Sequence, residues 1–349
     1  MTSTNNQVAA PGTVLILGSA GRLGLSVARA FARAGWAVLA QVRPTRDVAQ
    51  LPEISGVEWL PHALDDLASL VAKAQGASVV VHALNPCYCN IAWRREGPTM
   101  MEQAIDVTRR LQATLMFPGN VYNFGSSMPE ILSEATPQLA TDSKGRVRIA
   151  VEQQLAAAAR AGGLRAVVIR AGDYFGSGEG SWFDQVLSKN LWKGQITYPG
   201  KLDIAHAWAY LPDLASTFVQ VAEKRDQLNA FDVLHFAGHT LRGKEWQDAL
   251  TRVALQLDWL PAGAALKVKR LPWRLLRLLA LAIPKYRSVA DMHHLWKRPH
   301  GLDNKRLTEL IGDEPHTSLA LASRAAVAEL YPHVLDAGGN TSPFAGALS

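Results

Sequence analysis

The chain has 349 residues, of which 48% are hydrophobic and 19% are charged. This length allows one large domain or two unequal ones, and the composition excludes a disordered chain, a collagen and a disulfide scaffold. The formal net charge of +6 is compatible with an anionic cofactor, but it is too small to indicate nucleic-acid binding.

Three features bear on where the protein resides. The two cysteines, Cys87 and Cys89, lack the CxxC spacing of redox and zinc sites, so we expect a reducing, cytoplasmic environment. The segment MTSTNNQVAAPG has no basic residue before an apolar run, so we expect no signal peptide. The nearest candidate for a membrane span, 271–284, contains Arg274 and Arg277 and is shorter than the ~20 residues required, so we expect no span.

The first half of the sequence alternates predicted strands with predicted helices. Strands are predicted over Thr13–Leu17, Trp36–Val42, Val57–Leu60, Ser78–His82, around Ala113–Phe117, and over Arg165–Arg170. Helices are predicted over 22–34, from Asp65 or Asp66 onward, over roughly 99–112, and over about 144–161. Strands that alternate with helices imply βαβ units, so the predicted fold class is α/β with a doubly wound parallel sheet.

The pattern changes after residue 175, where strands become fewer and seven of the ten tryptophans lie between Trp182 and Trp296. We therefore predict a core over residues 12–175 and a smaller, mostly helical, substrate-facing portion over 176–335, with some core elements interleaved. Residues 336–349 are predicted to form a loose tail.

The first predicted strand leads into a glycine-rich turn, and the turn leads into a helix. The turn consists of Gly18, Ser19, Ala20, Gly21, Arg22, Leu23 and Gly24. Glycines allow a tight turn and a close approach of the backbone to a pyrophosphate, and the helix N-terminus offers free N–H groups to the phosphates. With a second strand following within ~30 residues, this context predicts a dinucleotide-binding Rossmann fold.

The end of the second predicted strand bears on the choice of cofactor. NAD-selective sites carry an acidic residue there to hold the ribose 2′-hydroxyl. This chain has Gln41-Val42-Arg43-Pro44 instead. Arg43 and Arg22 would suit a 2′-phosphate, which a planar guanidinium binds well, although each is also explained as a solvated surface residue. The sequence therefore favours NADP(H) over NAD(H).

These residues resemble the short-chain dehydrogenase/reductase superfamily, in its extended and atypical branch, the NAD-dependent epimerase/dehydratase family. The resemblance covers about residues 12–330 and includes the Gly-x-x-Gly-x-x-Gly spacing. Further matching segments are Val79–Pro86, Asn120–Gly125, Arg170–Gly176, His206–Ala215 and Gly301–Gly312. The resemblance implies a homodimer and cofactor contacts at His62, Ala63, Ala83, Leu84, Asn85, Arg148, Ala171, Gly172 and Asp173.

The catalytic part departs from that family's pattern of Tyr-x-x-x-Lys with a preceding Ser or Thr. None of the seven tyrosines has Lys four residues later. Matching to the family puts Lys144 in the Tyr position and Arg148 in the Lys position, and no hydroxyl residue lies within Pro118–Asn120. The resemblance therefore does not supply the usual proton relay.

Lys144 and Tyr122 are the candidate acid/base residues. Lys144 would serve if desolvation and a neighbouring cation lowered its pKa, although a solvated lysine at a helix start would also explain it. The family places Tyr122 beside the substrate, although packing under the cofactor loop would also explain it. Asn120 would orient a substrate carbonyl or cap the turn. The histidines contain no HExxH motif, and we expect no metal site.

The leading hypothesis is an NADP(H)-dependent oxidoreductase that transfers a hydride to or from a small carbonyl or alcohol with a non-standard acid/base. A sugar-nucleotide epimerase or dehydratase is the alternative enzyme. The alternative from another class is a catalytically silent NADP(H)-binding sensor or regulator. Such a protein would be expected to have lost the family's catalytic relay, as this sequence has.

Overall fold

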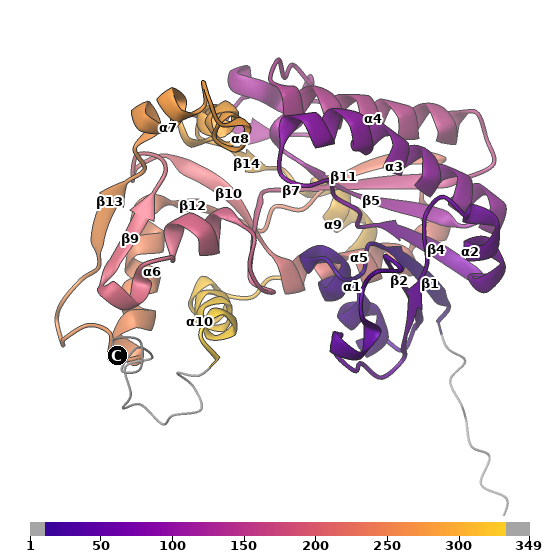
Figure 1. Ribbon diagram of the computed structural model, residues 1–349, viewed down its shortest axis with the longest axis horizontal. Coiled ribbons are helices and arrows are strands. Elements are labelled where there is room, and N and C mark those ends of the chain that lie inside the picture. The colour runs from indigo at the N-terminus through magenta and orange to yellow at the C-terminus, as the bar shows by residue number, and fades with distance from the viewer. Residues whose placement is uncertain (1–10, 333–349) are drawn as a thin grey trace, which may run out of the picture.

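The computed structural model describes residues 11–332, so the tail predicted over 336–349 lies outside the described residues. A seven-stranded parallel sheet forms the centre of the molecule, in the order β11-β7-β5-β4-β1-β2-β3 (Figure 1). Its strands are β1 (Thr13–Leu17), β2 (Ala37–Val42), β3 (Val57–Pro61), β4 (Ala77–His82), β5 (Thr114–Asn120), β7 (Arg165–Ala171) and β11 (Phe231–His235). The predicted doubly wound α/β fold is confirmed.

Helices cover both faces of this sheet. In Figure 1, α3 (Asn90–Leu111) and α4 (Ser143–Arg160) lie above it, and α1 (Arg22–Arg33) and α5 (Leu211–Glu223) lie below it. Side chains of β1 alternate between the two layers: Leu15 and Leu17 join the core with α3 and α4, whereas Val14 and Ile16 join the core with α1 and α5. The short helix α2 (Leu67–Lys73) begins at the predicted cap, Asp66, whose carboxylate accepts the Ser69 N–H.

One helix boundary was predicted wrongly. The sequence pattern places the start of the third helix near residue 99, but α3 begins at Asn90 and contains Pro98. Proline is favoured at the first position of a helix, so Pro98 resembles a start signal. In the folded chain Pro98 instead lies in the helix interior, where its ring removes one backbone hydrogen bond.

Outside the central sheet the chain forms short sheets, most of whose strands lie in its second half, and further helices. One sheet contains β8 (Asp173–Phe175), β10 (Ala205–Tyr210) and β12 (His239–Arg242). Two-stranded sheets pair β9 (Gln195–Tyr198) with β13 (Lys267–Arg270), and β6 (Ile131–Leu132) with β14 (Gly301–Leu302). The helices are α6 (Gly243–Gln256), α7 (Trp273–Leu279), α8 (Pro284–Ala290), α9 (Lys305–Ile311) and α10 (Leu319–Leu330). None of the helices in residues 11–332 is long and apolar enough to cross a membrane.

Two elements of the central layers come from the part of the chain after residue 175. Helix α5 packs on α1, and β11 is the edge strand beside β7. The strand order reverses between β4 and β1, which are neighbours in the sheet. In open α/β sheets, ligands bind beyond the carboxyl ends of the strands at such a point. The fold therefore directs attention to the residues that follow β1, β4, β5 and β7.

Candidate active site

The glycine-rich turn between β1 and α1 is held in a compact shape by its own backbone. Gly18 adopts a φ of +80°, and a Cβ there would press on the backbone of Ala83 and Leu84, the residues that follow β4. A Cβ on Gly24 would collide with the carbonyl oxygen of Gly18. Helix α1 has no side-chain cap on its first N–H groups and no acidic residue in its first turn. These residues fit a pyrophosphate at the helix N-terminus.

Alanine substitutions at two glycines should separate binding from folding. Gly21 has an ordinary φ of −78°, and a Cβ there would lie 3.4 Å from the Gly18 oxygen. We expect Gly21→Ala to change the free energy of unfolding by less than about 0.5 kcal/mol while weakening the binding of a nicotinamide dinucleotide, since the methyl group would occupy the pyrophosphate approach. Gly24→Ala should destabilise the fold by about 1–3 kcal/mol through overpacking. Urea unfolding measures stability and calorimetric titration measures binding. Equal losses of stability in Gly21→Ala and Gly24→Ala would contradict the assignment of Gly21 to the pyrophosphate site.

Behind the turn, a buried glutamine joins three strands. Gln41 at the end of β2 accepts the Gly18 N–H at 3.0 Å and donates to the carbonyl oxygens of His62, at 2.6 Å, and Val42, at 3.1 Å. His62 is buried, and its Nδ1 lies 2.7 Å from the Ala63 oxygen. The Gln41 side chain is thus fully engaged in fixing the turn against β2 and the end of β3.

The two arginines predicted to hold a 2′-phosphate occupy different environments. The Arg22 guanidinium donates to the carbonyl oxygens of Gly176, at 2.6 Å, and Ser177, at 3.4 Å, in the loop after β8. Burial lowers the pKa of Arg22. Arg43 is exposed at the end of β2. In this arrangement Arg22 positions the loop after β8, whereas Arg43 lies at the end of β2, where dinucleotide-binding Rossmann folds hold the adenosine ribose.

The predicted residue Lys144 lies buried at the start of α4. Its Nζ donates to Asn90 Oδ1 at 3.1 Å and to the Ser288 carbonyl oxygen at 3.0 Å, and it lies 4.0 Å from the centroid of the Tyr88 ring. Burial lowers the pKa of Lys144 to about 8. An ammonium group has three N–H donors, so one remains beyond these two hydrogen bonds. Lys144 is thus not the solvated helix-start lysine that the sequence left open.

This pKa predicts a specific pH dependence of stability. The unfolded chain holds the Lys144 proton up to its ordinary pKa of 10.5, whereas the folded chain releases it near 8. The unfolded state therefore binds more protons between these values, and stability rises with pH across that window. From pH ~7 to pH ~10, we expect the unfolding free energy of the wild type to rise relative to Lys144→Met by the order of 1 kcal/mol or more. Urea titrations of both proteins test this, and parallel pH curves would contradict it.

A buried hydrogen-bonded chain lies at the carboxyl ends of β5 and β7. The Tyr122 hydroxyl donates to Asp173 Oδ1 at 3.3 Å, and Asp173 Oδ2 lies 2.8 Å from His206 Nε2. The His206 ring stacks on Trp296 with centroids 4.1 Å apart. Burial, followed by the Asp173 charge, raises the pKa of Tyr122 well above its ordinary value. Sequence reasoning named Tyr122 and Asp173 separately but missed His206, whose place in the matching segment His206–Ala215 was the available signal.

Other predicted site residues lie at the ends of β4, β5 and β7. Asn120 Oδ1 accepts the Tyr122 N–H at 3.0 Å, which is the turn-capping role left open above. Gly172 follows β7, and a Cβ there would collide with the Ala207 carbonyl oxygen of β10. Ala171 is buried at the end of β7, and Asn85 is exposed in the loop after β4.

Arg148, one helical turn after Lys144, points toward the end of β5. Its Nη1 donates to the Pro118 carbonyl oxygen at 3.2 Å, and its guanidinium lies over the rings of Trp93 and Phe117. Its Nε is buried without a hydrogen-bond partner. An unpartnered buried donor here would be satisfied by a polar group of a bound ligand, which fits the cofactor contact that the resemblance implies.

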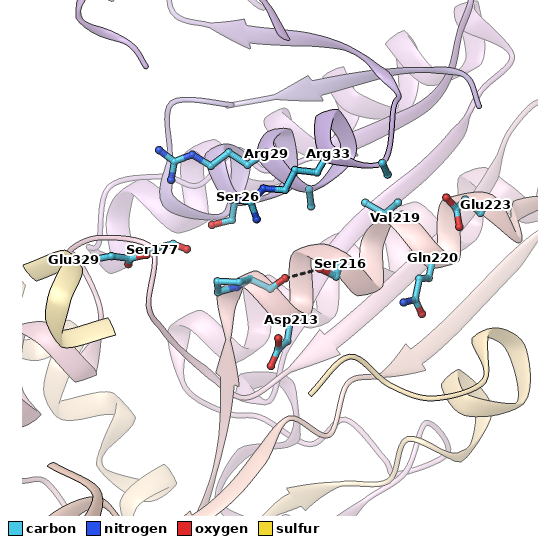
Figure 2. A pocket seen from close by; sticks show the side chains of 13 residues that line it. Ser26, Arg29, Arg33, Ser177, Asp213, Ser216, Val219, Gln220, Glu223 and Glu329 are labelled. Atoms are coloured by element: carbon cyan, nitrogen blue, oxygen red, sulfur yellow. Dashed lines mark hydrogen bonds between the residues drawn. The ribbon is translucent and has the colours of Figure 1, made fainter. Parts of the chain in front are cut away.

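A separate groove of about 460 Å³ lies between α1 and α5 (Figure 2). Figure 2 shows Arg29 and Arg33 on the α1 side and Glu223 on the α5 side. Neither Tyr122 nor Lys144 lines this groove, so it lies apart from the acid/base candidates. Among the residues that the structure describes, no group of three or more His, Cys, Asp or Glu side chains is arranged to hold a metal ion.

The parallel sheet, the glycine turn and the open helix N-terminus define a Rossmann-type α/β protein of the nucleotide-binding class. A sequence profile of the NAD-dependent epimerase/dehydratase family matches residues 14–235. The chain belongs to this family. The match spans the glycine turn, the Tyr122–Asp173–His206 chain and β11.

Solved structures share the whole fold at low sequence identity. UDP-glucose 4-epimerase from Stenotrophomonas maltophila, with bound NAD and formylated UDP-arabinopyranose, has a TM-score of 0.73 and 14% identity, and the match covers 93% of this chain and 100% of that one. UDP-glucose 4-epimerase from Brucella ovis, in complex with NAD, has a TM-score of 0.69 and 18% identity, with coverages of 93% and 98%. No curated protein matches the chain significantly.

Proposed function

We propose that the protein is an NADP(H)-dependent oxidoreductase that transfers a hydride to or from a small carbonyl or alcohol substrate. The observation that carries this proposal is the buried chain formed by Tyr122, Asp173 and His206. It supplies a hydroxyl, a carboxylate and an imidazole where the family's usual Tyr-x-x-x-Lys relay is missing. The chain lies just after β5 and β7, where open α/β sheets bind their ligands.

In the direction of carbonyl reduction, Tyr122 would donate its hydroxyl proton to the substrate oxygen. A bound nicotinamide would supply the hydride. A tyrosine hydroxyl is already protonated at neutral pH, and burial and the Asp173 charge raise the pKa of Tyr122 further, so the hydroxyl carries the proton that is to be donated. The positive charge of Arg148 lowers the pKa of Tyr122 and would stabilise the anion left behind. The Asp173–His206 pair orients the hydroxyl, and Lys144 is the second candidate donor.

NADP(H) is proposed over NAD(H) because the end of β2 carries Arg43 and no acidic residue. The solved relatives described above contain NAD, so the choice needs a direct test. We propose that residues 12–175 bind the nucleotide and that residues 176–335 face the substrate. We further propose that the protein is a cytoplasmic homodimer.

Calorimetric titration with NADPH, NADP and NADH in parallel tests the cofactor site. Losing a charge-assisted contact to the 2′-phosphate costs about 1.5–3 kcal/mol, so Arg43→Ala should weaken NADPH binding roughly 10- to 100-fold and leave NADH binding unchanged. Arg22→Ala is the matched control, because Arg22 holds the Gly176–Ser177 loop and its loss should weaken both cofactors alike.

If Arg43→Ala leaves NADPH affinity unchanged, the 2′-phosphate assignment is wrong. If none of the three nucleotides binds, the oxidoreductase proposal fails. Tight NADPH binding without turnover of any member of a carbonyl panel would instead support a silent sensor.

A second candidate is an epimerase-like reaction on a sugar nucleotide. Family membership favours it, as does the fold shared with solved UDP-glucose 4-epimerases. Incubation with UDP-glucose and NAD, followed by chromatography for the 4-epimer, tests this candidate. Appearance of the epimer would make it the better assignment.

A further inference from the structure

Two cysteines follow β4 and lie next to one another in space. Cys87 and Cys89 are the only cysteines in the sequence, and their Sγ atoms are 3.6 Å apart. The Cys89 N–H donates to the Cys87 carbonyl oxygen at 2.6 Å, which closes a tight turn with Tyr88 at its apex. Cys87 is exposed and Cys89 is half-buried. A small movement of the side chains would bring the two sulfurs to bonding distance.

The two sulfurs differ in chemical character because Cys89 caps a helix. Its Sγ accepts the Ala92 N–H at 3.4 Å at the start of α3, a helix of 22 residues. That hydrogen bond, followed by one from Cys87, lowers the pKa of Cys89, whereas donation to Cys89 raises the pKa of Cys87. A thiolate is the nucleophile in exchange with a disulfide. The arrangement thus pairs an activated Cys89 with a neighbouring Cys87 thiol able to resolve a mixed disulfide.

The residue between the cysteines belongs to the candidate active site. The Tyr88 ring lies over the Lys144 ammonium and packs edge-on against Trp93. The Tyr88 side chain is also partly exposed to solvent, so it lies at the rim of this group of residues. The next residue after Cys89 is Asn90, which bonds Lys144. A covalent bond between Cys87 and Cys89 would therefore tighten the turn on which Tyr88 is carried.

We propose that Cys87 and Cys89 form a dithiol modification site that exchanges with low-molecular-weight disulfides such as glutathione disulfide, and that closing the intramolecular disulfide moves Tyr88. The Cys89 thiolate attacks one sulfur of the disulfide, which forms a mixed disulfide and releases one glutathione thiolate. Cys87 then attacks Cys89 Sγ and releases the second glutathione, which takes up the Cys87 proton. The two protein sulfurs are oxidised and one glutathione disulfide is reduced to two thiols.

The first experiment measures the chemistry alone. The full chain is incubated with glutathione disulfide, alkylated with iodoacetamide and weighed intact by mass spectrometry. We expect a product that is two hydrogen atoms lighter than the reduced protein and carries no alkyl group. Dithiothreitol should convert this product back to the reduced protein. Cys87→Ser should stop at one glutathione on Cys89, and Cys89→Ser should react at least about tenfold more slowly, because its remaining thiol is not activated. Mixed disulfides that accumulate on the wild type, or equal rates for the two variants, would overturn the proposal.

The second experiment measures the coupling to Tyr88, which concerns the active site of the proposed function. Hydrogen–deuterium exchange of reduced and oxidised protein should differ in peptides spanning residues 85–96 and 284–292, because Asn90 bonds Ser288 and Asp291. Exchange that is unchanged by oxidation would refute the movement of Tyr88. Failure of NADPH to bind would refute the proposed function and leave both of these results intact.

Discussion

Tyr122→Phe should lower the rate of NADPH-dependent carbonyl reduction by about 10²- to 10⁴-fold, the range that positioned proton donors contribute. The substitution removes the hydroxyl that donates to Asp173 and leaves the buried ring in place. We therefore expect NADPH affinity to stay the same while turnover falls. Steady-state rates with a substrate from the carbonyl panel, together with calorimetric titration, measure the two quantities.

Lys144→Met is the comparison that decides between the two candidate donors. The Lys144 ammonium already gives two hydrogen bonds to Asn90 and Ser288, so we expect its loss to reduce turnover less than Tyr122→Phe does. A larger loss for Lys144→Met would assign the proton donor to Lys144. Comparable turnover in Tyr122→Phe and the wild type would remove Tyr122 from the mechanism.

Glu152→Ala should destabilise the protein by about 3–5 kcal/mol, because it leaves a buried positive charge without its partner. Glu152 and Arg170 are almost fully buried, and their closest nitrogen and oxygen atoms are 2.6 Å apart. The carboxylate also accepts hydrogen bonds from Asn123 and Gln138. Urea unfolding at neutral pH measures the loss.

The matched control is an ion pair that is exposed to solvent on the protein surface. Asp106 and Arg110 on α3 approach to 2.8 Å, but both side chains are more than a third exposed. Exposed pairs contribute about 0–1 kcal/mol, so Asp106→Ala should have little effect. If Glu152→Ala is no more destabilising than Asp106→Ala, then Glu152 does not stabilise the buried charge of Arg170.

The sequence predicted six of the seven strands of the central sheet, because these six are short, mostly apolar runs bounded by turn residues, but it did not predict β11. Thr13–Leu17 forms a strand with the predicted bounds, and Asp66 caps α2 as expected. The start of α3 could not be predicted in this way, since packing of its first turns overrides the signal of Pro98.

The candidate site was predictable only in part, because local patterns reveal residue types and not contacts between distant segments. The glycine turn is a local motif, and its predicted compact shape appears in the structure. By contrast, Tyr122 and His206 are 84 positions apart and meet through Asp173, and the carbonyl oxygens that engage Arg22 lie more than 150 positions away. Such partners follow from tertiary packing, which a single sequence does not display.

The late position of β11 has a consequence for biosynthesis. This strand covers β7 at the edge of the central sheet, and its buried Asp232 pairs with Arg306 of α9 at 2.9 Å. In a nascent chain, β7 therefore forms an unpaired edge strand, because β11 is complete only after more than sixty further residues have been translated. Halves of the gene divided near codon 175 should yield an aggregation-prone first fragment, rescued when the second fragment is co-expressed and supplies β11.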